Sequence, residues 1–348
     1  MKNNRLIYLL IIILFVWILA LSILTNKKYD SNIHETIIEN NISGFSTDLT
    51  KVVEKCKDSI VTINANGTVS SGFVYKQEES NIYILTSYHG VSESNILSVV
   101  FSGGLNMNAE LIGKDIYTDL AVLRIESPYN INSLSLSDSS KLKDGEFIIC
   151  LGTPFSIEYN QTVELGMISK NHRVLENSIT VDNENYKYYV DLIQLSSNLN
   201  PGFSGSPLLN MNGEVVGVVN MALNNKTNFA ISSNEIKIIA DSIISDEELV
   251  RNNLGIKGSY VHDMPMFEKT NLNLPVDVIN GFYVDGVLMN SLANLANVKN
   301  GDVILSINDI EINNIVDYLD ILYSHSDSFD FKVYRDSNII NLKVNTND

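Results

Sequence analysis

The sequence contains little cysteine and little positive charge, and each shortage excludes a class of protein. Only two cysteines, Cys56 and Cys150, occur among 348 residues. They allow at most one disulfide, so a disulfide-framework protein and a cysteine-rich zinc module are excluded. Lys and Arg total 24 against 41 Asp and Glu, which gives a net charge of −17. A surface this acidic repels phosphate backbones and excludes a nucleic-acid partner.

Histidine is also scarce, and its spacing does not favour a metal site. No two histidines are separated by three residues, and no nearby cysteine pair completes a ligand set. We therefore expect no bound metal. The five histidines are His34, His89, His172, His262 and His325.

One long hydrophobic run lies near the N-terminus. It extends for 20 residues from Leu6 to Thr25 and is flanked by Arg5 and Lys27. About 20 helical residues cross a hydrocarbon core, whereas a cleavable signal peptide has an apolar region of about 7–15 residues and a small-x-small cleavage site. The run ends LSILTNKK, without such a site. We predict an uncleaved anchor over residues 1–28 and a polar linker over 29–45, although the flanking charges leave the orientation open.

The rest of the chain has a mainly β pattern. From about residue 46 to 240, short β-type runs such as SIVTINA, NIYILTSY and EVVGVVNMA are separated by turn residues. Strands without alternating helices predict an antiparallel sandwich or barrel. Residues 234–250 have helical spacing of isoleucine and are expected to form a linking helix. From residue 252 onward, expected strands near YVHDM, GFYVDGVL, DVILSIN, FDFKVYR and IINLKV alternate with two helical pieces.

Three polar residues occur in the order His, Asp, Ser at places where strands begin or end. His89 ends the run NIYILTSYHGV, and Asp119 opens the run DLAVLRI. Ser204 lies in the glycine-flanked turn PGFSGSP, where glycine permits unusual dihedral angles and converging N–H groups. A serine activated by histidine, with the histidine oriented by aspartate, requires these three side chains to converge from separate loops.

The segments TSYHGV, TDLAVL and NPGFSGSPLLNMNGEVVGV resemble the HtrA/Deg family of serine proteases with a C-terminal PDZ domain. The resemblance covers roughly residues 50–345 and implies a chymotrypsin-like double β-barrel over 46–245 and an α+β PDZ domain over 252–345. It implies that Ser204 is the nucleophile, His89 the general base and Asp119 the residue that orients His89. The implied oxyanion hole is formed by the N–H groups of Gly202 and Ser204, with Phe203 between them.

The chain departs from the family pattern in the nucleophile turn. The usual GNSGG is GFSGS here, with Phe203 and Ser206 at the second and fifth positions. Phe203 lacks a polar group that would help to fix the turn, and Ser206 has less conformational freedom than glycine. A catalytically weak PDZ peptide sensor or holdase therefore remains an alternative to an active endopeptidase.

The resemblance also suggests residues for specificity and regulation. Asn198 precedes the nucleophile by six residues, so no acidic residue favours cleavage after Arg or Lys. Arg173 matches an arginine that couples a sensor loop to the oxyanion turn, and an exposed loop cation is the alternative. The segment expected to form the pocket wall contributes Asn220, Met221, Phe229 and Ala230.

The segment NNLGIKG matches the beginning of the family's PDZ domain. The N–H groups of Leu254, Gly255 and Ile256 would bind a peptide C-terminal carboxylate, and the peptide would then add as a β-strand. Residues 254–348 contain 6 Lys and Arg against 13 Asp and Glu, so apolar peptide C-termini are favoured over acidic ones.

Taken together, the resemblance implies a DegS-like serine endopeptidase of the bacterial cell membrane, single-pass, with its catalytic domain outside the cytoplasm. Its substrates would be unfolded or membrane-bound regulatory proteins, as in protein quality control and stress response. A homotrimer is expected from the family, and no metal or organic cofactor is implied.

Overall fold

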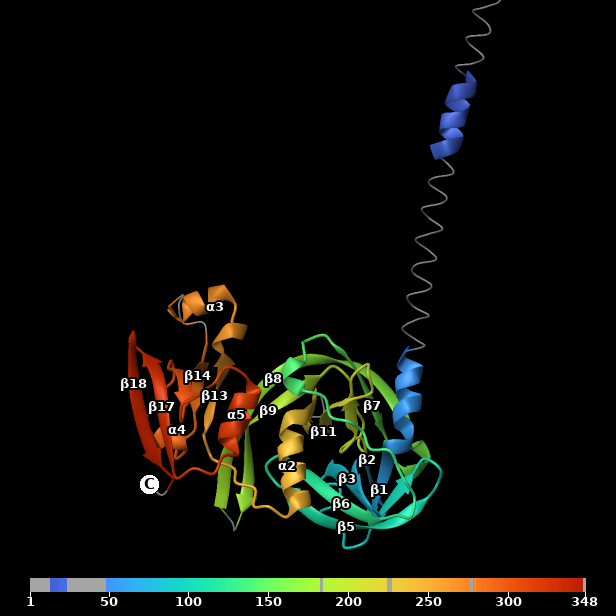
Figure 1. Cartoon of the computed structure of the whole chain (residues 1–348), viewed down its shortest axis with the longest axis horizontal. Coiled ribbons are helices and arrows are strands. Elements are labelled where there is room, and N and C mark those ends of the chain that lie inside the picture. Colours follow the sequence, from blue (N-terminus) through green and yellow to red (C-terminus); the bar gives the residue numbers. More distant parts are fainter. Residues whose placement is uncertain are drawn as a thin grey trace, which may run out of the picture. The chain divides into compact units, whose positions relative to one another are not determined.

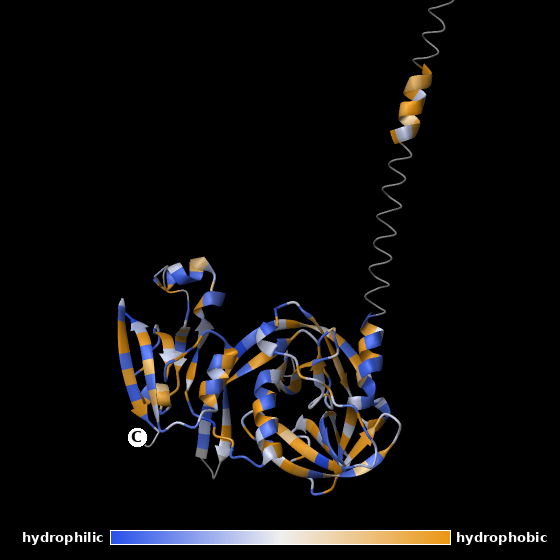
Figure 2. Cartoon of the chain, in the orientation of Figure 1, coloured by the Kyte–Doolittle hydropathy of each residue, from blue (hydrophilic) through white to orange (hydrophobic). Residues whose placement is uncertain are grey.

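The computed structural model describes residues 13–23, 48–181, 184–223, 227–275, 278 and 280–346. Residues 13–23 form a helix with exposed and mainly hydrophobic side chains (Figure 2). Within the described ranges, no helix is both long and apolar enough to span a membrane. The predicted anchor extends beyond residues 13–23 on both sides, and the predicted linker over 29–45 lies outside the described residues.

Two closed antiparallel barrels follow one another along the chain (Figure 1). The first has the strand order β1-β2-β3-β6-β5-β4, and alternate side chains such as Ile63, Ile84 and Leu123 fill its interior. Its first hairpin turns at Asn66 and Gly67, both at positive φ, as a two-residue type I′ turn requires. The strands are β1 (Ile60–Ala65), β2 (Thr68–Glu78), β3 (Asn81–Ser87), β4 (Leu97–Phe101), β5 (Asn106–Asp115) and β6 (Leu120–Glu126).

The second barrel closes in the order β10-β11-β12-β9-β8-β7. Strands β8 and β9 form a long hairpin, with paired residues from Ile168↔Leu195 to Val181↔Glu184. The strands are β7 (Phe147–Gly152), β8 (Thr162–Val181), β9 (Glu184–Leu195), β10 (Pro207–Leu209), β11 (Val215–Leu223) and β12 (Thr227–Ser232). This double barrel confirms the mainly β fold expected from the sequence.

Helix α2 (Ser233–Ser245) follows the second barrel and packs against strands of both barrels. Its N-cap is Ser232, whose hydroxyl accepts the N–H of Glu235, and it ends at Asp246 in the left-handed conformation. The isoleucine spacing within residues 234–250 therefore predicted the helix correctly, although the helix ends earlier than that segment. Short 3-10 helices occur at Lys57–Ser59, Ser139–Lys141, Ile157–Tyr159 and Val261–Asp263.

The C-terminal part is an antiparallel sheet in the order β13-β14-β15-β17-β18, with β16 paired to β15. Hydrophilic and hydrophobic residues alternate along β17 and β18, as expected for a sheet with one buried face (Figure 2). The elements are β13 (Ile256–Tyr260), α3 (Met266–Asn271), β14 (Phe282–Val287), α4 (Leu292–Leu295), β15 (Val303–Ile307), β16 (Ile310–Glu311), α5 (Ile315–Leu322), β17 (Ser328–Arg335) and β18 (Asn338–Asn345).

One expected strand in this part is wrong. The segment YVHDM was expected to be extended, but β13 ends at Tyr260 and Val261–Asp263 forms a 3-10 turn. Val261 is fully buried, so the presence of a β-branched hydrophobic residue here is explained by core packing rather than by strand formation. Helix α3, which begins after Pro265, was not expected.

Both cysteines are unpaired and buried. Cys56 contacts the carbonyl of Gly213, and Cys150 lies within the core of the second barrel. Burial raises the pKa of both thiols, so neither has the thiolate character of a reactive cysteine.

Candidate active site

His89 and Asp119 are brought together by the pairing of two neighbouring strands. Strand β3 ends at Ser87 and β6 begins at Leu120, and these two residues are paired in register. Asp119 Oδ1 accepts the backbone N–H of His89 at 2.7 Å, and Asp119 Oδ2 lies 2.5 Å from His89 Nδ1. One carboxylate therefore contacts both the backbone and the ring of His89.

The contact with Asp119 determines the chemical state of the imidazole. An ionised carboxylate only accepts hydrogen bonds, so Nδ1 carries the proton and Nε2 has a free lone pair. The hydrogen bond that His89 donates to Asp119 raises the pKa of His89, although partial burial opposes this effect. The arrangement suits a general base that becomes a stabilised cation when it takes a proton.

Ser204 lies in a turn that packs against the end of the same strand β3. Gly202 and Gly205 have φ values of 102° and 85°, which residues other than glycine rarely adopt. The carbonyl of Ser204 accepts the N–H of Ser71 at 3.0 Å. A Cβ placed on Gly205 would clash with Ser71 O and would lie 2.9 Å from Ser87 N, two residues before His89.

The nucleophile turn leaves two backbone donors available. Within the described ranges, the N–H groups of Gly202 and Ser204 donate to no acceptor, whereas Phe203 N–H donates to Asn200 O at 3.2 Å. In the same part of the chain no hydrogen bond joins Ser204 Oγ to His89. Free N–H groups on either side of Phe203 are suited to stabilise an oxyanion.

Ser71 supports this turn and was not identified from the sequence. Its hydroxyl donates to Gly202 O at 2.7 Å and accepts Thr153 N–H at 2.8 Å. Ser71 lies in the middle of β2 and has no local motif. Its role becomes visible only in the folded chain, where it contacts Gly202, about 130 residues away in the sequence.

The side chain of Phe203 anchors the turn by packing rather than by hydrogen bonding. It is 1% exposed and belongs to the core of the second barrel. We expect Phe203→Ala to lower the free energy of unfolding by about 3–5 kcal/mol, because truncation of a buried phenylalanine leaves a cavity. Urea unfolding followed by far-UV circular dichroism would measure this, with exposed Phe267→Ala as the control. Equal stability of both variants would contradict the anchoring role.

Ser206 is completely buried, and within the described ranges its hydroxyl has no hydrogen-bond partner. Its φ is not positive, so the position does not require glycine. We expect Ser206→Ala to raise the free energy of unfolding by about 1 kcal/mol, because it removes an unpaired polar group. Ser206→Gly, the matched variant, should be less stable than Ser206→Ala by about 0.5–1 kcal/mol, because it frees the unfolded backbone. Thermal unfolding of the two variants and the unsubstituted protein in parallel would test this. A Ser206→Ala variant less stable than the unsubstituted protein would contradict it.

The residues expected to form the pocket wall are mostly packed inside the protein. Asn220 is buried and its amide donates to Thr118 O, while Phe229 and Ala230 are 4% and 0% exposed. Ala230 belongs to the barrel core. Asn198 is exposed, and the side chain of Met221 lies outside the described residues. The assignment of these residues to the pocket wall stays a prediction.

Arg173 lies on the β8–β9 hairpin, where it is exposed and its Nε donates to Gln194 Oε1 at 3.1 Å. This contact crosses the hairpin between neighbouring strands. The regulatory role of Arg173 stays a prediction.

Of the three residues expected to bind a peptide carboxylate, Leu254 and Gly255 precede strand β13 and Ile256 is its first residue. Leu254 and Ile256 are buried, and Gly255 has φ of 65°. The Leu254 N–H already donates to Asn252 O at 2.9 Å. Contrary to the expectation, it is therefore not free to bind a ligand. Among the strands that the structure describes, β13 pairs only with β14 and is therefore an edge strand. A cavity of about 350 Å³ borders it and is lined by residues including Ile256, Tyr260, Ile315, Tyr318, His172 and Tyr189.

Comparisons with known proteins agree with this geometry. A family model for the trypsin-like peptidase domain matches residues 70–218. The serine protease Do-like HtrA of Lactobacillus helveticus is 32% identical over 284 residues, which cover 79% of this chain and 67% of that protein. The protein of the same name from Lactococcus lactis subsp. cremoris is 30% identical over 346 residues, covering 88% and 84%.

Solved structures show the same fold. A structure of the HtrA-type protease AlgW with a tripeptide matches 85% of this chain and 95% of its own, with a TM-score of 0.59 and 23% identity. At this identity the similarity is one of fold.

Proposed function

The chain belongs to the HtrA family of serine proteases, and we propose that it is a membrane-anchored endopeptidase that uses Ser204, His89 and Asp119. The pair of hydrogen bonds between Asp119 and His89, beside the Ser204 turn at the end of β3, is the observation that carries this proposal.

The proposed reaction follows from the donor and acceptor roles of these groups. His89 Nε2 takes the proton of Ser204 Oγ as the oxygen attacks the carbonyl carbon of the peptide bond. The carbonyl oxygen becomes negatively charged and accepts hydrogen bonds from the N–H groups of Gly202 and Ser204. His89 then gives its proton to the departing amine, and water hydrolyses the ester formed on Ser204 by the same proton transfers. Asp119 stabilises the imidazolium throughout.

We further propose that the C-terminal sheet is a PDZ domain that binds peptide C-termini. The edge strand β13 and the cavity that β13 and α5 line together with strands β8 and β9 support this. An extended peptide would pair with the free edge of β13, and its carboxylate would approach Gly255 and Ile256. Binding there would regulate cleavage of unfolded or membrane-bound envelope proteins.

Anchoring and assembly complete the proposal. The helix at 13–23 is uniformly exposed and lies within the apolar run that we propose as a single-pass bacterial membrane anchor, with the barrels outside the cytoplasm. A homotrimer would cover apolar side chains exposed around the 3-10 helix at Ile157–Tyr159 and on β8. These are Phe155, Tyr159, Val163, Leu165 and Met167.

A serine-reactive fluorophosphonate applied to the full chain in detergent micelles tests the proposal. We expect labelling at Ser204 that is lost in His89→Ala, because only an activated serine reacts. Cleavage of an unfolded protein should increase when a peptide with an apolar C-terminus is added. Absence of labelling together with measurable peptide binding would instead favour the peptide sensor.

A further inference from the structure

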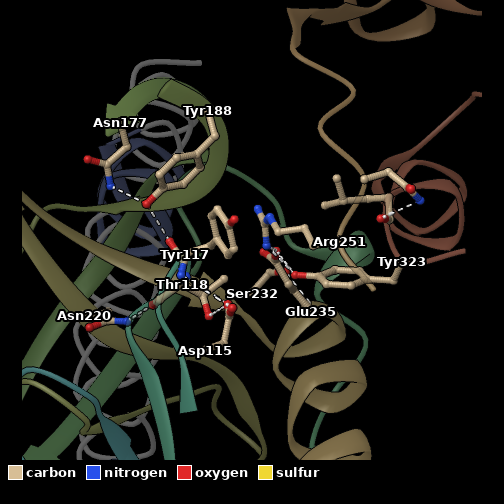
Figure 3. Close-up of polar contacts among 12 residues, drawn as sticks. Asp115, Tyr117, Thr118, Asn177, Tyr188, Asn220, Ser232, Glu235, Arg251 and Tyr323 are labelled. Carbon is tan, nitrogen blue, oxygen red and sulfur yellow. Dashed lines mark hydrogen bonds and ion pairs between the residues drawn. The ribbon is translucent and has the colours of Figure 1, made fainter. Parts of the chain in front are cut away.

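A buried cation that the proposed reaction does not use lies between the barrels and the C-terminal sheet. Arg251 is in the segment that joins α2 to β13, and its side chain is 9% exposed. Its Nη1 lies 3.1 Å from Glu235 Oε1 and 2.5 Å from the hydroxyl of Tyr323. That hydroxyl also donates to Glu235 Oε1 at 2.8 Å. The three residues therefore form a closed cluster between the first turn of α2 and the end of α5 (Figure 3).

The guanidinium of Arg251 also contacts aromatic rings. It lies 5.4 Å from the ring centroid of Tyr323, 5.3 Å from that of Tyr117 and 5.9 Å from that of Tyr188. Cation–π attraction of this kind is strengthened where water is excluded. Tyr117 and Tyr188 pack edge to face at 5.2 Å. Arg251 thus connects the C-terminal helix to a ring that lies two residues before Asp119.

The segment 115–119 has little freedom to move except as a unit. Asp115 Oδ2 accepts the N–H and the hydroxyl of Thr118 at 3.0 and 2.6 Å. Tyr188 donates to Tyr117 O at 2.8 Å, and the amide of Asn220 donates to Thr118 O (Figure 3). A shift of Tyr117 would therefore be transmitted through Thr118 to Asp119.

We propose that Arg251 is a positioning residue for Asp119: the Arg251–Glu235–Tyr323 cluster holds Tyr117 and thereby sets the orientation of the carboxylate that binds His89. This inference rests on the proposed catalytic role of Asp119. A buried ion pair is seldom more stable than well-packed hydrophobic residues of the same size, so stability alone does not account for it. The cluster gives the end of α5 a direct physical connection to the active site.

The test compares two double variants of the full chain. Arg251→Met combined with Glu235→Met removes both charges of this ion pair and keeps side-chain volume, so neither partner is left without the other. We expect its kcat to fall 10- to 100-fold with KM unchanged, since misplacement of a catalytic group by about 1 Å costs roughly that much. The control is Arg335→Met with Asp302→Leu, which removes the ion pair between β17 and the start of β15. Its kcat should stay within twofold.

Two readouts separate positioning from a merely structural role. Rates are divided by the fraction of chains that the fluorophosphonate labels, which removes any effect of incomplete folding. The acid limb of the pH–rate profile should also move to lower pH, because a weakened hydrogen bond from His89 to Asp119 raises the pKa of His89 less. An unchanged kcat per labelled site and an unchanged acid limb would overturn this inference alone. Failure of the unmodified chain to be labelled would overturn the proposed function, and this inference with it.

Discussion

Replacement of Ser204 by alanine should lower kcat by roughly 10⁶-fold and leave KM nearly unchanged. The nucleophile is lost, but substrate contacts and the free N–H groups of Gly202 and Ser204 remain. Residual turnover of about 10³- to 10⁴-fold above the uncatalysed rate is therefore expected. Initial rates on an unfolded protein substrate would measure the loss. Ser102→Ala, at an exposed serine that follows β4, is the matched control and should retain full activity.

Combining Ser204→Ala with His89→Ala tests whether the two residues act together, which Ser204→Ala alone does not. Ser204 and His89 act as one unit, so Ser204→Ala with His89→Ala should be no slower than Ser204→Ala alone. If the two losses instead multiplied, the residues would act independently and the proposed proton transfer between them would be wrong.

Asp119→Asn should lower kcat by roughly 10⁴-fold. Asparagine has nearly the same shape as aspartate but a different set of donors. Its oxygen can still accept the His89 backbone N–H, as Asp119 Oδ1 does at 2.7 Å. Its NH₂ group then faces His89 Nδ1 and forces the proton onto Nε2. In that tautomer the ring cannot accept the proton of Ser204.

The backbone at this position makes the variant informative. Asp119 has φ of 56°, a left-handed conformation that asparagine adopts readily. The variant should therefore fold normally, which circular dichroism would verify. The acid limb of its pH–rate profile should move to lower pH, because the carboxylate that raises the pKa of His89 is gone. Retention of activity within tenfold would show that Asp119 does not control the tautomer.

The parts of this protein that were predicted correctly are those with a local signal. The Ile spacing of α2 and the period-two runs of the barrels are examples. His89 and Asp119 were also identified because each lies at a strand end. Their contact depends on the pairing of Ser87 with Leu120, which the sequence alone does not display.

The residues that were misjudged or missed depend on tertiary packing. Phe203 was considered only for the polar group it lacks, whereas its buried ring anchors the turn. Arg251 has no motif, because its partners Glu235 and Tyr323 are 16 and 72 residues away. Such contacts become visible only when the chain has folded.

Because both thiols are buried, correct folding protects them from oxidation. In an oxidising compartment, a folded molecule keeps Cys56 and Cys150 away from oxidants and from other chains. Cys56 lies against Gly213, in the turn between β10 and β11, and Cys150 lies in the core of the second barrel. An unfolded molecule exposes both and can be cross-linked to its neighbours. Unfolded molecules can therefore become linked by disulfides, whereas folded molecules cannot.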